Sequence, residues 1–549
     1  MIILKSYFPA PNVIGLFILL FLLMLLYFPN SGGLGIALPC NLEFIGWLGL
    51  VVVVVLWRIP LRVISANRQP LITAGCLVLA LPWLLQARGN PGVWVLLAGW
   101  LMWMLLQRLS ITSFDKRFIC AMVFILALAQ SLICLIQVFL PQLAGQLYEY
   151  DWLRNHGRPY GIFQQANLLA SFLATGLGCG FLLITQTTHR AGTITCCLGL
   201  SLLAFVLMIN QSRAGALGAG LMILLISLLH WQSVARRIIT VISMMAVCAF
   251  AGWYITHHIQ ILIDGVPYLI ARDYDASTHE RWNILSITWQ MILQKPWLGW
   301  GYGTFEYTFS RYVLAHPELP YTYSSVVAHP HNELLYDWFQ GGIVALVGLM
   351  MLIGGWIKMV LCAGTRGRLR ISYSLLIIPL LVHLSLEFPF YLSFIHFALF
   401  IVLLRLGCPD NARTTEVTTT FRLAGLVCGA LMVGYSAIGL YANHQLTHFE
   451  RDKFAEFPSP VPWYFAVQLD RAEFDAMVAL LIDFNQSHNQ ANLEQYMQRA
   501  ERWSLRHNDS NVWLSMMTIA QYRGEKEKLT RMKQVYPRLF PLQKQWKAH

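Results

Sequence analysis

Long apolar runs separated by short polar stretches recur along the chain from residue 13 to residue 441. A helix of about 20 mostly apolar residues is long enough to cross the hydrocarbon core of a bilayer, and it satisfies its own backbone hydrogen bonds there. The pattern therefore predicts an all-α polytopic membrane protein. The first run, Val13–Phe28, lacks a small-x-small cleavage site and is followed by further runs, so we expect it to be a retained helix.

The apolar runs predict about thirteen transmembrane helices, with boundaries that are soft by several residues. The expected spans are 13–28, 43–57, 70–86, 91–107, 118–140, 166–186, 192–209, 214–230, 237–256, 335–362, 371–386, 389–406 and 421–441. This division gives four regions. They are an N-terminal membrane region (1–256), a large polar loop (257–334) that ends in a histidine cluster, C-terminal membrane helices (335–441) and a helical tail (442–549).

The composition agrees with a membrane protein. Of the 549 residues, 57% are hydrophobic and 12% are charged, against about 25% charged in soluble domains. The net charge of +12 could suggest nucleic acid. The basic residues instead sit mainly in alternate short loops, where they orient the helices, so we expect a lipid bilayer and no nucleic acid as partner.

The charge bias between loops also predicts sidedness. The opposite short loops hold few cations: Arg88, Arg154, Arg158 and Arg213. The positive-inside rule then places the N-terminus in the cytoplasm, and the large loop and the tail on the other side. In a Gram-negative cell that side is the periplasm and the membrane is the inner membrane. The 11 cysteines lie mostly in apolar runs without a C-x-x-C pair, which favours buried thiols over disulfides or zinc.

The most informative polar stretch is His329-Pro330-His331-Asn332-Glu333, which closes the large loop where a new apolar run begins. Ionisable side chains at a membrane surface are costly unless they are used or well solvated. Histidine exchanges a proton near neutral pH more readily than other side chains. We therefore expect an enzyme, although a capping or interfacial histidine is the plainer alternative for His331.

Two further polar turns lie on the same expected side. Arg158 precedes a span in a segment that also contains Gln164 and Asn167, and Arg213 lies in the turn Asn210–Gly215. Arginine offers a planar fork that suits phosphate oxygens, and helix N-termini add N–H donors. Anchoring at lipid headgroups is the alternative for the arginines, and helix-to-helix bonding for the amides. Glu387 either pairs with an arginine or is solvated alone.

The large loop and the tail allow two interpretations each. The aromatic string Lys295–Gly303 suits either an interfacial belt and packing or stacking against sugars. Amphipathic patterns in the tail predict helices at Leu493–Leu505, Val512–Tyr522 and Leu529–Tyr536, which resemble a tetratricopeptide-like pair. This tail either docks an acceptor or is a passive cap. Asp273-Tyr274-Asp275 is a rival metal site.

Taken in order, these motifs resemble the O-antigen ligase and O-oligosaccharyltransferase superfamily. The resemblance rests on Arg158–Phe163 with Gln164 and Asn167, on Ser212–Gly215, and on the long loop that ends in His329–Asn332. The amphipathic tail looks more like that of the PglL-type protein-glycosylating branch, some of whose members are pilin-specific.

This resemblance implies transfer of a glycan from undecaprenyl diphosphate to a serine or threonine hydroxyl of an acceptor protein, such as a type IV pilin, with no metal or cofactor. His331 would be the general base, and Arg158 and Arg213 would hold the diphosphate and stabilise the departing charge. Arg281 is a further candidate for the diphosphate. The other candidates for substrate binding are Gln164, Asn167, His329, Asn332 and Glu387.

Three other functions remain open from the sequence. An O-antigen ligase or polymerase would use a lipid A core or another glycan as acceptor, and the tail argues against it. A transporter of lipid-linked glycans would also suit several spans with outward cations, although transporters often carry inverted repeats, and we see none. The third alternative is a non-catalytic scaffold of an envelope assembly.

Overall fold

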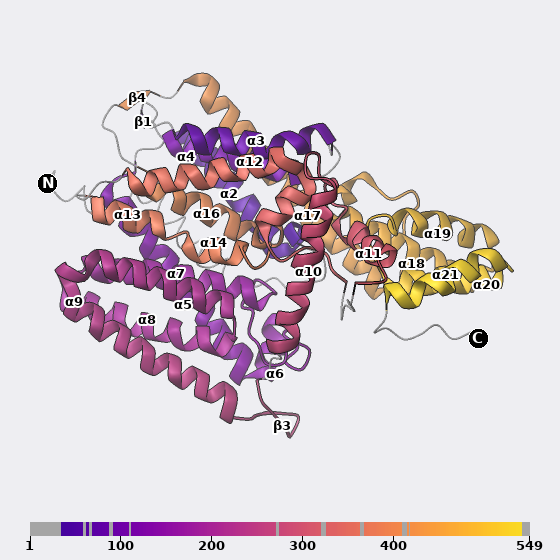
Figure 1. The fold of residues 1–549 in the computed structure, drawn as a ribbon, viewed down its shortest axis with the longest axis horizontal. Coiled ribbons are helices and arrows are strands. Elements are labelled where there is room, and N and C mark those ends of the chain that lie inside the picture. Colours follow the sequence, from indigo (N-terminus) through magenta and orange to yellow (C-terminus); the bar gives the residue numbers. More distant parts are fainter. Residues whose placement is uncertain are drawn as a thin grey trace.

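The computed structural model describes residues 35–58, 62–64, 69–86, 92–108, 111–270, 274–319, 326–362, 367–408, 414–416 and 418–540. The expected helix at 13–28 lies outside these residues. Within them the chain is mostly helical, with two small two-stranded sheets. The main body is a bundle of helices, and a smaller helical unit lies beyond one end of it (Figure 1).

Six described helices are long and apolar enough to cross a membrane. They are α5 (Ser113–Phe139), α7 (Ala166–Gln186), α8 (Arg190–Asn210), α9 (Arg213–His258), α12 (Glu333–Leu361) and α17 (Thr419–Arg451). Shorter apolar helices lie in α2 (Pro39–Arg58), α3 (Pro70–Gln86), α4 (Gly92–Arg108) and α16 (Phe394–Leu406). The remaining bundle helices are η2 (Gly35–Ala37), α6 (Pro141–Tyr148), α13 (Arg368–Leu375), α14 (Ile378–Leu384) and α15 (Pro389–Leu392). The predicted class of helical membrane protein is confirmed, whereas the number of thirteen spans remains a prediction.

Helix α7 lies at the centre of the bundle, and most of its side chains are buried. Small residues allow the close approach that packing between apolar helices requires. At Gly176, for example, an added Cβ would collide with the side chain of Ala127 on α5. Helices α5, α8, α9 and α14 all pack against α7.

Helix α9 contains both expected spans 214–230 and 237–256. Its backbone leaves the helical conformation at Val234 (φ −142°, ψ 33°). The chain turns back there, so that both ends of α9 lie at the same end of the bundle (Figure 1). A side-chain bond fixes this return, because Nε2 of Gln211, just before α9, donates to the carbonyl oxygen of Ile270, just after it, at 2.9 Å.

Helix α12 is also interrupted, at Gly342 (φ 64°, ψ −156°). A break in a helix leaves carbonyl groups without their usual partners. Here the segment before α11 (Phe305–Ala315) supplies the missing N–H donors. Trp300 N–H donates to the carbonyl of Phe339 at 2.7 Å, and Gly301 N–H to that of Gln340 at 3.1 Å. The large loop is therefore bonded into the membrane helix that follows it.

Two arginines bond backbone carbonyls at one end of the bundle. At this end, which we call the basic end, Arg237 donates to the carbonyls of Ile184 and Thr187, and Arg405 donates to that of Leu106. The other end carries α6, the large loop and the smaller helical unit (Figure 1). We call it the α10 end, after helix α10 (Tyr274–Gln294) of the large loop. The sidedness predicted from the loop charges stays a prediction.

The large loop forms a hairpin and two helices. Strands β2 (Ile261–Ile263) and β3 (Val266–Tyr268) pair through a turn at Asp264-Gly265, where both residues have positive φ (51° and 81°), as tight hairpin turns require. Helices α10 (Tyr274–Gln294) and α11 (Phe305–Ala315) follow. A second small sheet forms outside the loop, where β1 (Arg62–Ile64) pairs antiparallel with β4 (Thr414–Glu416).

Beyond the bundle lie η4 (Trp463–Gln468), α18 (Leu469–Ser487), α19 (Gln490–Trp503), α20 (Ser510–Tyr522) and α21 (Lys526–Leu539). The last three match the expected tail helices. Helix α17 continues to Arg451, ten residues past the expected end of the last span at 441. Helix α18 was missed, although Phe474, Met477, Leu481 and Phe484 recur at helical spacing and pack into the core of this unit.

Candidate active site

A buried carboxylate, Glu387, lies between α14 and α15 at the α10 end and gathers side chains from two distant segments and from the adjoining α14. Its Oε1 accepts bonds from Asn167 Nδ2 at 2.5 Å and from Arg281 Nη2 at 2.7 Å. Its Oε2 lies 3.2 Å from Gln165 Nε2 and 3.3 Å from His383 Nε2. Of the two alternatives left open by the sequence, Glu387 takes the first, because it pairs with an arginine.

These contacts keep Glu387 ionised. Burial by itself would raise the pKa of the carboxyl group. The hydrogen bond and charge of His383, followed by the charges of Arg281 and His331, outweigh burial and lower the pKa of Glu387 to about 2. A carboxylate with such a pKa carries a full negative charge at neutral pH, so it can hold Arg281 in place electrostatically.

The segment before α7 is held by two buried glutamines of α5. Gln137 accepts from the backbone N–H groups of Tyr160 (3.0 Å) and Gly161 (2.9 Å), and its Nε2 donates back to the carbonyl of Gly161 at 3.0 Å. Gln130 accepts from the N–H of Ile162 at 3.2 Å. Because buried backbone groups need partners, these amides fix the shape of the loop that carries Arg158.

Arg158 and Arg213 are both tied to this end of the bundle. Arg158 Nε donates to the carbonyl of Asn210, in the turn that precedes Arg213, at 3.2 Å. Arg213 begins α9, and its Nη2 donates to Oγ1 of Thr278 on α10 at 2.9 Å. The turn between α8 and α9 thus lies beside the Arg158 loop and also touches the helix that carries Arg281.

Ser212 links this turn to the carboxylate. It caps α9 by accepting from Gly215 N–H, and its hydroxyl donates to Oδ1 of Asn167 at 2.9 Å. Asn167 then donates to Glu387. Side-chain hydrogen bonds therefore join the turn before α9, the start of α7 and the segment of Glu387.

The histidine cluster forms a tight turn before α12. His331 adopts a left-handed conformation (φ 58°). The next residue, Asn332, caps α12 by accepting from Leu335 N–H, and its Nδ2 donates to the carbonyl of Ser385 at 3.1 Å. This bond ties the turn to the segment of Glu387. The rings of His329 and His331 meet edge to face, 4.2 Å apart.

Both imidazoles are neutral at physiological pH. Burial is the main cause, and the Arg281 charge adds to it, so the pKa of His331 falls to about 4. Burial, followed by the influence of His331, lowers the pKa of His329 well below its usual value. Among the described residues, neither Nδ1 atom has a hydrogen-bond partner. Each neutral imidazole therefore keeps a nitrogen lone pair that can accept a proton.

The aromatic string of the large loop is largely used for packing. Trp300 donates to the carbonyl of Met291 at 2.8 Å and stacks on Phe339, and Lys295 lies 4.0 Å from its ring centroid. Tyr302 is buried and stacks on Trp83 at 4.4 Å. Trp300 and Tyr302 thus have their faces covered by protein, which favours the packing interpretation over sugar stacking for these two rings.

Sequence reasoning missed several residues around Glu387. Gln164 turns the chain (φ 58°), but its neighbour Gln165 makes the contact with the carboxylate. His383 was also missed, although it stands four residues before Glu387, a spacing at which helical side chains meet. The rival metal motif cannot be judged, because Asp273 lies outside the described residues. Among the described residues, no group of three His, Cys, Asp or Glu could hold a metal ion.

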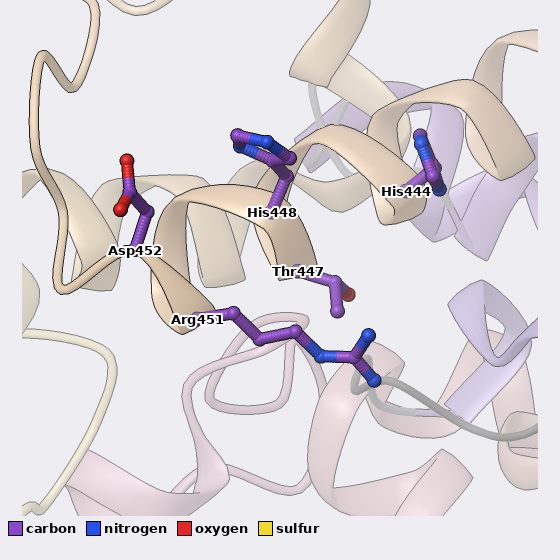
Figure 2. Close-up of a pocket in the computed structure, with 5 residues that line it drawn as sticks. All are labelled: His444, Thr447, His448, Arg451 and Asp452. Atoms are coloured by element: carbon purple, nitrogen blue, oxygen red, sulfur yellow. The ribbon is translucent and has the colours of Figure 1, made fainter.

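A pocket of about 370 Å³ lies at the C-terminal end of α17 and is lined by His444, Thr447, His448, Arg451 and Asp452 (Figure 2). Their side chains leave the helix in different directions (Figure 2). None of the five takes part in the bonds around Glu387. We therefore place the candidate active site around Glu387 and His331.

The fold and this site define a class: a multi-pass helical membrane protein with arginine, carboxylate and histidine groups gathered at one end of the bundle. Comparison with known proteins agrees with it. The family model described as "O-Antigen ligase" matches residues 198–350, "Virulence factor membrane-bound polymerase, C-terminal" matches 372–549, and "Protein glycosylation ligase" matches 159–178. The chain is thus similar to the O-antigen ligases over residues 198–350 and to the protein glycosylation ligases over residues 159–178.

The three matched segments contain most of the site. Arg213, Arg281 and the two histidines fall in the first, and Glu387 falls in the second. A curated relative, an O-antigen ligase of Salmonella typhimurium, is 35% identical over 72 residues. That match covers 13% of this chain and 17% of the relative, so the chain matches about a sixth of the curated relative's length.

Proposed function

We propose that this protein is an O-oligosaccharyltransferase. It transfers a preassembled glycan from undecaprenyl diphosphate to a serine or threonine hydroxyl of a protein acceptor, such as a type IV pilin. The observation that carries the proposal is the network around Glu387, which joins Arg281, Asn167 and the histidine turn at one end of a membrane bundle. The match to a protein glycosylation ligase over 159–178 supports a protein acceptor.

The chemistry follows from the charges. Neutral His331 accepts the proton of the acceptor hydroxyl as its oxygen attacks the anomeric carbon from the side opposite the diphosphate. The bond between that carbon and the diphosphate oxygen breaks, and configuration at the carbon inverts. Arg158, Arg213 and Arg281 stabilise the charge that develops on the leaving diphosphate, in a partly buried site where such stabilisation is strong.

Glu387 is a positioning residue in this mechanism. Its ionised carboxylate holds Arg281 at 2.7 Å, and it also raises the basicity of His331 against the effect of burial. Gln164, Asn167, His329 and Asn332 complete the candidate substrate-binding groups. Because Asn167 and Asn332 are both bonded within the network, their first role is to hold the loops that face the substrate.

We further propose that the α10 end faces the periplasm of a Gram-negative cell and that the basic end faces the cytoplasm, in the inner membrane. The bias of basic residues toward alternate short loops of the sequence supports this orientation. The helices after residue 441 lie at the α10 end (Figure 1), where they are placed to receive a periplasmic acceptor.

An O-antigen ligase or polymerase is the second candidate. The family match over 198–350 and the Salmonella relative favour it, because both carry the description O-antigen ligase. The same arginines and histidine would serve that reaction. The difference lies in the acceptor, which would be a lipid A core or a growing glycan.

Expression in a heterologous Gram-negative cell separates these functions. The cell would hold a lipid-linked glycan, a pilin-like acceptor and this chain. A glycan-sized mass shift on the intact acceptor protein, measured by mass spectrometry, is the expected result. Glycan appearing on lipid A core, or as longer chains with the acceptor protein unmodified, would instead identify a ligase or a polymerase.

A further inference from the structure

Helix α10 has an apolar face that stays largely exposed among the described residues, although one of its rings, Trp289, meets Trp338 of α12 edge to face. Trp282, Trp289 and Leu293 recur at spacings of seven and four, which places them along one side of the helix. Their exposed fractions are 71%, 44% and 58%. The stripe continues past the end of the helix into Trp297 (71%) and Leu298 (73%).

The opposite face of α10 is well packed. Ile284, Ile287, Met291 and Ile292 are buried in a cluster with residues of α11 and α12, such as Phe305. The smaller helical unit docks on α11, since Arg538 donates to the carbonyl of Leu314 at 2.8 Å. The exposed stripe is thus left over after both the bundle and the tail helices have packed.

The orientation of α10 indicates what covers this stripe. The helix lies across the ends of the bundle helices (Figure 1). If the bundle helices cross a membrane, α10 lies in the plane of its surface. A surface helix that presents Trp and Leu on its outer face can insert that face into the boundary between headgroups and acyl chains.

Neighbouring elements carry the same apolar exposure at the same end of the bundle. On α6, Leu143 and Leu147 are exposed, and on the β2–β3 hairpin Leu262 and Val266 are exposed. Lys295, which follows α10 and lies over the Trp300 ring, is exposed beside the Trp297-Leu298 turn, as expected of a lysine at a headgroup surface. These features fit a bilayer surface better than a protein partner, because they are spread over three separate elements.

We propose that α10 and the Trp297-Leu298 turn form an interfacial anchor in the outer leaflet of the bilayer, in contact with lipid acyl chains. Arg281 lies next to Trp282 on the same helix and bonds Glu387. The anchor therefore fixes the depth of Arg281 at the level of lipid headgroups, where the diphosphate of a lipid-linked donor lies. This last role rests on the proposed function, whereas the anchor itself does not.

The test uses the full chain in nanodiscs of phosphatidylethanolamine and phosphatidylglycerol. A nitroxide is attached through a ketone-bearing non-natural residue at position 289 or 293, which leaves the 11 native cysteines in place. The control label replaces Tyr522, an exposed aromatic (61%) on α20. We expect labels at 289 and 293 to collide more with oxygen than with a water-soluble nickel chelate, and the label at 522 to show the reverse.

Collision with nickel at 289 and 293, or protection from both reagents, would overturn the anchor, because the stripe would then face water or protein. A second arm compares Trp289→Asp with Tyr522→Asp in the transfer assay. We expect several-fold higher KM for the lipid-linked donor in Trp289→Asp and no change in Tyr522→Asp. If transfer is absent in the wild type, the proposed function fails while the collision data still decide the anchor.

Discussion

Glu387 is a carboxylate buried within a membrane protein, and such a group is stable only when its charge is matched. Removing one partner of a buried ion pair costs about 3–5 kcal/mol, since the remaining charge is left uncompensated. Here Arg281, Asn167, Gln165 and His383 divide the two carboxylate oxygens among them. The same bonds that stabilise the carboxylate also draw the proposed catalytic segments together.

Substitution of Arg158 tests whether transfer needs the planar guanidinium group of this residue. We expect Arg158→Lys to lower kcat/KM for transfer by at least about tenfold, because a point charge does not replace two directed N–H donors on a diphosphate. Arg154→Lys is the matched control, since Arg154 is an exposed arginine in the same loop. Near-normal transfer by Arg158→Lys would indicate that Arg158 only anchors the loop.

Arg281 adds to the effect of burial on the basicity of His331. Burial and the Arg281 charge hold the pKa of His331 at about 4, below its ordinary value of 6.5. In Arg281→Gln the second cause disappears and the Glu387 charge is no longer neutralised, so the pKa of His331 rises. We therefore expect the acid limb of the pH profile of transfer, relative to each variant's own plateau, to move to higher pH.

The matched control for that shift is Arg311→Gln. Arg311 lies on α11 and contacts the Trp513 ring of the tail helices. Arg311→Gln should leave the acid limb of the pH profile where it is in the wild type. An acid limb that stays in place in Arg281→Gln as well would separate the pH dependence from His331.

At the scale of elements, the break in α12 couples the large loop to the membrane bundle. Gly342 has a backbone conformation that is close to forbidden for other residues, and an added Cβ would collide with the carbonyl of Trp297. We expect Gly342→Ala to lower the thermal stability of the detergent-solubilised protein by several degrees. Gly354→Ala on the same helix, where a Cβ meets nothing, should leave stability unchanged or raise it.

An equal melting temperature for both glycine variants would contradict this assignment of the break. The comparison is informative because both substitutions add the same methyl group to the same helix. They differ only in backbone conformation and in the neighbour that the methyl group meets.

At the scale of the whole molecule, α11 joins the large loop to the tail helices through a cluster of charges. His507 lies 3.7 Å from Glu306 on α11 and 3.8 Å from Asp470 on α18. Burial would lower the pKa of His507, but the interactions with Asp470 and Glu306 outweigh burial and raise it to about 9. Arg506 lies beside the same Asp470, at 3.5 Å.

A raised histidine pKa makes this junction pH-dependent. The stabilisation is fully present below the unfolded value of about 6.5 and is lost as pH rises through about 9. Thermal denaturation between pH 6.5 and pH 9.5 should therefore show a fall in melting temperature that is smaller in His507→Gln. His444→Gln, which alters an exposed histidine, should keep the wild-type slope; an unchanged slope in His507→Gln would rule the junction out as its source.

The sequence predicted much of this arrangement because apolar length is a strong signal. Twelve of the expected spans lie on described residues, and each falls on helical segments. The pairing of Glu387 with Arg281 was left open, because 106 residues separate them and no local pattern links them. Gln165 was missed for the same reason, because 222 residues separate it from Glu387. His383 was missed although it lies four residues before Glu387, a local spacing that could have indicated the contact.

The central claim is that His331 accepts the acceptor proton in glycan transfer. Its most direct test is the purified enzyme with a lipid-linked glycan and an acceptor protein, followed by intact-mass spectrometry. Asn tolerates the left-handed conformation at this position, so His331→Asn removes the imidazole with little strain; His156→Asn is the control, since His156 has a similar φ of 52° and is exposed. We predict a glycosylated acceptor with the wild type and His156→Asn and none with His331→Asn. Full glycosylation by a folded His331→Asn would contradict the account.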